Sequence, residues 1–139
     1  MLFLEIFFSP FNPFSKFLNS VQGINTNFGR KTSMADDPEL RRLLWYLLGG
    51  TRGGENRARV IHELKNRPCN LNQLAKRLGL EYRSVQHHIE VLKKNSMVTS
   101  QGERYGLTYF VHPWLESHYD LFEDVVKKLN LKLESGTDL

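Results

Sequence analysis

The stretch from residue 70 to residue 98, NLNQLAKRLGLEYRSVQHHIEVLKKNSMV, constrains the fold more than any other part of the chain. Its first part carries apolar residues at the i, i+3, i+4, i+7 spacing of one buried helix face, at Leu71, Leu74, Ala75 and Leu78. Asn70 and Gln73 are spaced to form a capping box at the start of this helix. Gly79 suits the left-handed residue that commonly ends a helix. The pattern therefore predicts a short, capped helix followed by a tight turn.

A second helix is predicted from about residue 81 to residue 95. It would bury Val85, Ile89 and Leu92. Its opposite face is polar and carries Arg83, Gln86, His87, Glu90 and Lys94. Two helices joined by a short turn, the second with a polar face, are typical of a helix-turn-helix that reads DNA.

The flanking segments extend this unit. A helix beginning at Pro38 is predicted after a cap at Asp36 or Asp37, and another over residues 54–66. Residues 97–111 change to the alternation of strands, with a glycine-containing loop at 101–106, which predicts a β-hairpin. The predicted fold class is mainly α with a small β-hairpin: a winged helix-turn-helix with additional N- and C-terminal helices. The wing would bring Arg104 beside the DNA backbone or minor groove.

Charge is distributed unevenly along the chain. Residues 52–94 contain ten Lys and Arg against four Asp and Glu, whereas residues 113–139 contain three Lys against six Asp and Glu. A basic middle and an acidic end indicate a middle segment that faces a polyanion; ordinary surface charge is the alternative. Arg52, Arg57 and Arg59 lie near the start of the 54–66 helix, where free backbone N–H groups also favour a phosphate. The four glycines of residues 49–54 lack the GxxxxGK[ST] motif, so an ordinary loop is preferred to a nucleotide cradle.

A final helix is predicted from Pro113 to about Lys132, with a broad apolar stripe. Because this stripe is large for a helix appended to a small domain, we expect a symmetric dimer, with packing inside one chain as the alternative. The predicted dimer interface comprises Leu40, Leu44, Leu47, Trp114, His118, Leu121, Phe122, Val125 and Leu129.

Residues 1–33 differ in composition from the rest and hold seven of the nine phenylalanines. Three interpretations remain open: a membrane-surface or partner-binding arm, a flexible apolar tail, or translated sequence upstream of a true start at Met34. The last is preferred, because exposed phenylalanines need a partner. Residues 34–139 are then the domain. No apolar run reaches membrane-spanning length, and we expect a cytoplasmic protein.

Other chemistry has little support in the sequence. The single cysteine, Cys69, excludes an intrachain disulfide; a small buried side chain is preferred for it over a redox-sensitive thiol. Adjacent residues on a helix point about 100° apart, so His87 and His88 cannot easily share one metal ion. We expect no metal, no cofactor and no enzymatic activity, since no motif places a catalytic set.

The segment GGTRGGENRARVIHELKNRPCNLNQLAKRLGLEYRSVQHHIEVLKKNSMV followed by YGLTYFV resembles archaeal winged helix-turn-helix transcriptional regulators of the ArsR-like superfamily. The resemblance covers roughly residues 38–130, and SVQHHIEVLKKNSMV is its most specific part. It implies a dimeric regulator that binds an operator, with the 81–95 helix in the major groove. Metal-sensing members carry cysteine pairs on the helix that matches residues 71–78, which here has no cysteine, so metal sensing is not implied.

These observations predict a sequence-specific regulator of transcription that binds double-stranded DNA as a dimer. Predicted base contacts are Arg83, Gln86 and His87. Predicted backbone contacts are Arg52, Lys76, Arg77, Tyr82, Ser84, Lys93, Lys94 and Arg104. The alternative is a winged-helix subunit that binds protein within a larger assembly.

Overall fold

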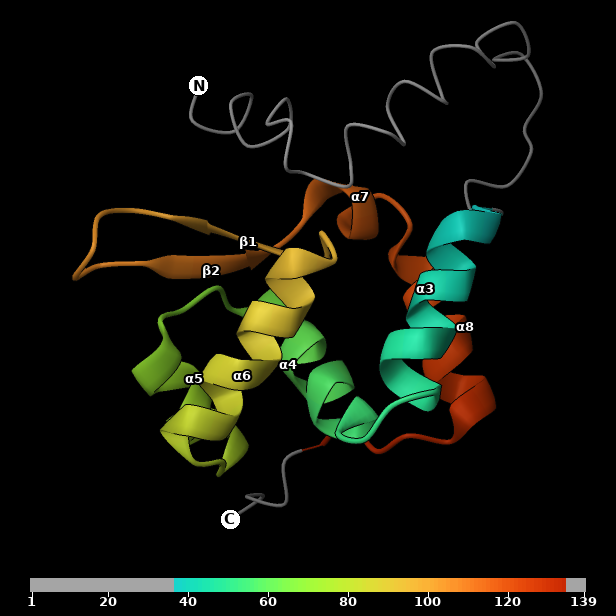
Figure 1. The fold of residues 1–139 in the computed structure, drawn as a ribbon, viewed down its shortest axis with the longest axis horizontal. Helices are drawn as coiled ribbons and strands as arrows, with labels where there is room; N and C mark the ends of the chain where they lie inside the picture. Colours follow the sequence, from blue (N-terminus) through green and yellow to red (C-terminus); the bar gives the residue numbers. More distant parts are fainter. Residues whose placement is uncertain (1–36, 135–139) are drawn as a thin grey trace, which may run out of the picture.

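The structure is a computed structural model that describes residues 37–134 (Figure 1). Four helices come first: α3 (Pro38–Gly49), α4 (Gly54–Asn66), α5 (Leu71–Leu78) and α6 (Tyr82–Lys94). The hairpin strands β1 (Val98–Gln101) and β2 (Thr108–Val111) follow, and then α7 (Pro113–Glu116) and α8 (Tyr119–Leu129). This is the predicted arrangement: helices, a helix-turn-helix, a wing and a terminal helical segment. The expectations for residues 1–33 and for a start at Met34 lie outside the described residues.

Helices α3 and α8 pack side by side, on the opposite side of α4 from α5 (Figure 1). Asp37 caps α3 by accepting hydrogen bonds from the backbone N–H groups of Glu39 and Leu40 at 3.1 and 3.0 Å. Its other carboxylate oxygen accepts a 2.9 Å hydrogen bond from Trp114 Nε1. Arg41 of α3 pairs with Asp124 of α8 at 2.8 Å. The first helix is therefore joined to the end of the described chain by polar contacts as well as by packing.

The residues predicted for a dimer interface lie largely in the core of one chain. Those with at most 7% of their surface exposed are Leu40, Leu44, Leu47, Trp114, Leu121, Phe122 and Val125. His118 and Leu129 are half-buried. The broad apolar stripe packs on α3 of the same chain, which accounts for it without a second copy. The homodimer stays a prediction, and these buried side chains are unavailable to form it.

The predicted single helix from Pro113 to Lys132 is wrong, because the chain breaks between α7 and α8. Continuing the helix would require the carbonyl of Trp114 to accept from the backbone N–H of His118. Instead, His118 N–H donates to Leu115, and the Trp114 carbonyl accepts from Ser117 Oγ at 3.1 Å and lies 2.9 Å from His118 Nδ1. Side chains thus compete for the helical acceptor, as serine and related polar residues commonly do.

The hairpin is fixed at its base and free at its tip. Val98 pairs with Val111 and Gln101 with Thr108 in an antiparallel register. Tyr109 N–H also donates to the carbonyl of Cys69 at 2.9 Å, which ties β2 to the segment that leads into α5. Gly102 has a φ of +112°, and a Cβ on it would lie 2.5 Å from the carbonyl oxygen of Gly106. A glycine is therefore needed where the hairpin turns.

Candidate nucleic-acid interface

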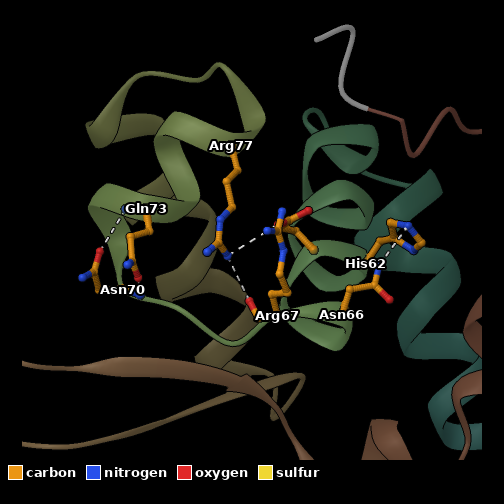
Figure 2. A network of polar contacts seen from close by, with 7 residues as sticks. His62, Asn66, Arg67, Asn70, Gln73 and Arg77 are labelled. Atoms are coloured by element: carbon orange, nitrogen blue, oxygen red, sulfur yellow. Dashed lines mark hydrogen bonds and ion pairs between the residues drawn. The ribbon is translucent and has the colours of Figure 1, made fainter. Parts of the chain in front are cut away.

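Helix α5 has, at its start and at its end, the local chemistry that the sequence predicted. Asn70 Oδ1 accepts from Gln73 N–H at 2.9 Å, and Gln73 Oε1 accepts from Asn70 N–H at 3.2 Å, a complete capping box (Figure 2). Gly79 ends α5 with a φ of +64°, in the left-handed region where a side chain adds strain. Leu80 N–H then donates to the carbonyl of Ala75. The left-handed Gly79 and the hydrogen bond of Leu80 set the direction in which the chain leaves α5 toward α6.

Helix α6 has one buried face and one exposed face. Val85, His88, Ile89 and Leu92 are buried against the rest of the domain. The three predicted base contacts, Arg83, Gln86 and His87, are all exposed. Long polar side chains with donors and acceptors therefore project from a helix whose opposite side is held by the core.

Most of the predicted backbone contacts are also exposed, namely Arg52, Lys76, Tyr82, Lys93, Lys94 and Arg104, whereas Ser84 is half-buried. Lys93 donates a 2.8 Å hydrogen bond to Ser100 Oγ, which links the end of α6 to the wing. Between the start of α5 and the end of the wing, five cationic side chains and three carboxylates are exposed. The cations are Lys76, Arg83, Lys93, Lys94 and Arg104, and the carboxylates are Glu81, Glu90 and Glu103. The surface has an excess of positive charge, which suits a polyanion.

Arg77 differs from the other predicted backbone contacts because it already has partners inside the domain. Its guanidinium donates to the carbonyl of Arg67 at 3.3 Å and lies 3.6 Å from the carboxylate of Glu63 (Figure 2). Arg67 also pairs with Glu63 at 3.5 Å. This network joins α5 to the end of α4, and Arg77 shares the single carboxylate of Glu63 with Arg67, so its guanidinium is held inside the domain and only partly compensated.

Arg57 and Arg59, considered as phosphate ligands from their place in the sequence, also bind inside the domain. Arg57 is 3% exposed; it donates to the carbonyls of Leu47 at 2.8 Å and Arg52 at 3.0 Å, and to Thr51 Oγ1. Arg59 donates to the carbonyl of Leu78 at 2.7 Å. Their charge lies among backbone acceptors, which corrects the interpretation of this arginine cluster. Burial also lowers the pKa of Arg57.

A small cleft lies where the starts of α5 and α6 meet the wing, and we call it the wing cleft. It has a volume of about 160 Å³ and is lined by Asn70, Leu71, Asn72, Tyr82, Arg104, Tyr105, Leu107 and Tyr109. Its lining combines a cation, two amides and three phenols. Sequence reasoning identified Tyr82 and Arg104 but missed Asn72 and Tyr105, because their place in one cleft depends on how the hairpin is oriented relative to α5 and α6.

Burial shifts the pKa values of two titratable groups near this surface, His88 and Cys69, toward their uncharged forms. His88 is buried on α6, and burial, with Arg57 and His87 nearby, lowers its pKa. Burial raises the pKa of the Cys69 thiol, which favours the predicted packing role over a reactive thiolate. Among residues 37–134, no group of three or more His, Cys, Asp or Glu side chains is arranged to hold a metal ion.

Comparisons with known proteins add little. No protein-family model and no curated protein matches the chain. Among solved structures, a probable transcriptional regulator from Pseudomonas aeruginosa is similar, with 14% identity and a TM-score of 0.43, over 66% of this chain and 78% of that chain. Similarity this low carries no argument about function. Within the described part of the chain, no helix has the length and apolar character needed to cross a membrane.

Proposed function

We propose that this protein is a sequence-specific regulator of transcription that binds double-stranded DNA. In this proposal α6 enters the major groove, and the wing lies on the backbone or in the adjacent minor groove. The observation that carries the proposal is the exposed row of Arg83, Gln86 and His87 on a helix anchored by its opposite face. A short helix-turn-helix followed by a hairpin is a common frame for such a reading helix.

The side chains on this face match the chemistry of base edges. Arginine can donate two hydrogen bonds to O6 and N7 of guanine, and glutamine can pair with N6 and N7 of adenine. We assign these base contacts to Arg83 and Gln86, with His87 beside them. Lys76, Lys93, Lys94, Arg52 and Arg104 would hold phosphates, which orient the protein without reading sequence.

A homodimer on an approximately palindromic site is part of the proposal, but its interface must use side chains that the single chain leaves exposed. Trp45 and Tyr46 of α3 are 37% and 58% exposed, and exposed Arg42 lies one turn away from both. Aromatic residues and arginine are enriched at protein interfaces. We therefore propose this face of α3 as the contact, to be examined by light scattering alongside the DNA titrations.

The test begins with selection of bound duplexes from a random DNA pool. Anisotropy titrations of a selected duplex and a scrambled duplex then follow across a salt series. Arg83→Ala is expected to lose roughly 5- to 150-fold in affinity for the selected duplex, the equivalent of about 1–3 kcal/mol, with little change for the scrambled one. Lys94→Ala should weaken both duplexes alike and reduce the salt slope by about 1.

Lys127→Ala is the matched control, because Lys127 is an exposed lysine on α8, outside the proposed interface. It should change neither affinity nor slope. No binding at low salt, or binding that does not respond to salt, would refute the proposal. That outcome would instead favour a winged-helix subunit that binds protein, for which the exposed Glu81 and Glu90 on the same surface are suited.

A further inference from the structure

The wing cleft has three tyrosines among its lining residues, which phosphate binding alone does not require. Tyr105, near the tip of the hairpin, is 98% exposed, and Tyr82, in the first turn of α6, is 46% exposed. A side chain as exposed as Tyr105 contributes almost nothing to the folded core. Both tyrosines nevertheless belong to the lining of the same hollow. Tyrosine rings offer a flat face on which any nucleobase can stack.

The polar groups of the wing cleft complement such a ring. Arg104 supplies one cation, and the exposed Asn72 supplies an amide that can both donate and accept. Tyr109 is 7% exposed; burial, with Tyr82 and Glu90 nearby, raises its pKa, so its hydroxyl stays protonated. A site for phosphate alone would gather several cations, whereas this cleft combines one cation with amides and phenols.

The size of the cleft limits what can enter. A volume of 160 Å³ corresponds to about five water molecules at their liquid volume, which is the scale of one nucleobase and too small for a base pair. In intact duplex each base is paired and stacked, so a base can enter only where it is unpaired or flipped out.

We propose that the wing cleft binds one unpaired nucleobase of the bound DNA, stacked on Tyr105 and Tyr82, with Arg104 on the adjoining phosphate. This inference rests on the proposed function, since the DNA must first lie along α6 and the wing. The protein then prefers DNA that has an unpaired or flipped base beside the wing over a perfect duplex of the same sequence.

The test compares three labelled DNAs by anisotropy: the selected duplex, the same duplex with one unpaired thymidine placed stepwise along its flanks, and the single strand. The wild-type chain is expected to bind one bulged duplex about 5- to 150-fold more tightly than the perfect one, from the usual value of one base–aromatic stack. Tyr105→Ala should remove this preference and leave affinity for the perfect duplex nearly unchanged. Tyr105→Phe should retain it, because stacking needs the ring and not the hydroxyl.

Lys127→Ala is again the control, since Lys127 is exposed on α8, outside both the wing cleft and the proposed dimer contact. It should leave the preference intact. A 2-aminopurine at the unpaired position gives a second readout: its fluorescence should fall on binding to wild type and to Tyr105→Phe but not to Tyr105→Ala. Because the Tyr105 side chain is almost wholly exposed, these variants should fold like the wild type.

The outcomes separate this inference from the proposed function. Equal affinity for bulged and perfect duplexes overturns the inference, as does a Tyr105→Ala variant that weakens both by the same factor. Either result leaves duplex recognition standing. Binding to the single strand that depends on Tyr105, without binding to any perfect duplex, supports the cleft and overturns the proposed function. Failure to bind all three DNAs overturns both.

Discussion

Replacing Arg57 by alanine is expected to destabilise the domain strongly, although the residue lies in an arginine-rich loop region that suggests phosphate binding. The side chain is 3% exposed and joins the end of α3 to the start of α4 through Leu47, Thr51 and Arg52. Hydrogen bonds from a charged donor each contribute about 1.5–3 kcal/mol. Removing a buried cation also removes its desolvation cost, which offsets part of that loss.

Three such bonds total about 4.5–9 kcal/mol, and a desolvation offset of several kcal/mol leaves a loss of about 3 kcal/mol in the free energy of unfolding. For a domain of this size the loss corresponds to a decrease in Tm of roughly 12–24 °C. The assay is thermal and urea denaturation followed by circular dichroism. Lys127→Ala, which removes an exposed cation of α8, is the control and should stay within about 0.5 kcal/mol of wild type.

A loss below about 1 kcal/mol in Arg57→Ala would refute the reasoning, since that is the level of one ordinary hydrogen bond. The opposite pattern, unchanged stability with weakened DNA binding, would restore Arg57 as a phosphate ligand. Measuring DNA affinity below the variant's Tm keeps the two effects separate.

Two further predictions concern stability. His112 is 2% exposed, its Nδ1 accepts from Trp114 N–H at 3.1 Å, and burial lowers its pKa to about 4. Its unfolded pKa of about 6.5 is higher, so the unfolded state binds the extra proton first. The contribution of neutral His112 to the free energy of unfolding should be complete above pH 6.5 and fall by about 3 kcal/mol as pH decreases to 4. Urea denaturation at each pH measures this decrease. In His112→Asn, the free energy of unfolding should change less with pH over this range than in wild type. Gly54→Ala should prevent normal folding, because a Cβ there would lie 1.9 Å from the carbonyl oxygen of Leu48. Gly79→Ala should cost only about 1–2 kcal/mol from its left-handed φ, and Gly79→Asn less. Equal losses in the two alanine variants would contradict this contrast.

Much of the local structure could be predicted because it depends on neighbours in the chain. The capping box of Asn70 and Gln73 and the left-handed Gly79 involve residues only a few positions apart. The two faces of α6 follow from helical periodicity, which is why Val85 and Arg83 were assigned correctly to opposite sides. The hairpin followed from strand alternation and its glycines.

The partners of long polar side chains could not be predicted in the same way. In the sequence, nothing distinguishes Arg77 and Arg57 from the exposed cations Lys76 and Arg83. Each nevertheless donates a hydrogen bond to a backbone carbonyl ten residues away in the chain. A flexible cation several bonds long can point to solvent or fold back, and periodicity does not choose between these states. The break between α7 and α8 was missed for a related reason, since Ser117 and His118 can join a helix or compete with it.

The sequence alone therefore determined the order and type of the elements as far as the hairpin, and the polar face of α6, because short-range periodicity and capping encode them. Only the tertiary structure decided which charges remain available and which side chains meet. It withdrew Arg57, Arg59 and Arg77 from the exposed cations, and it placed Tyr82 and Tyr105, far apart in the chain, in the lining of one cleft. The physical reason is that burial and pairing depend on contacts between segments far apart in the chain.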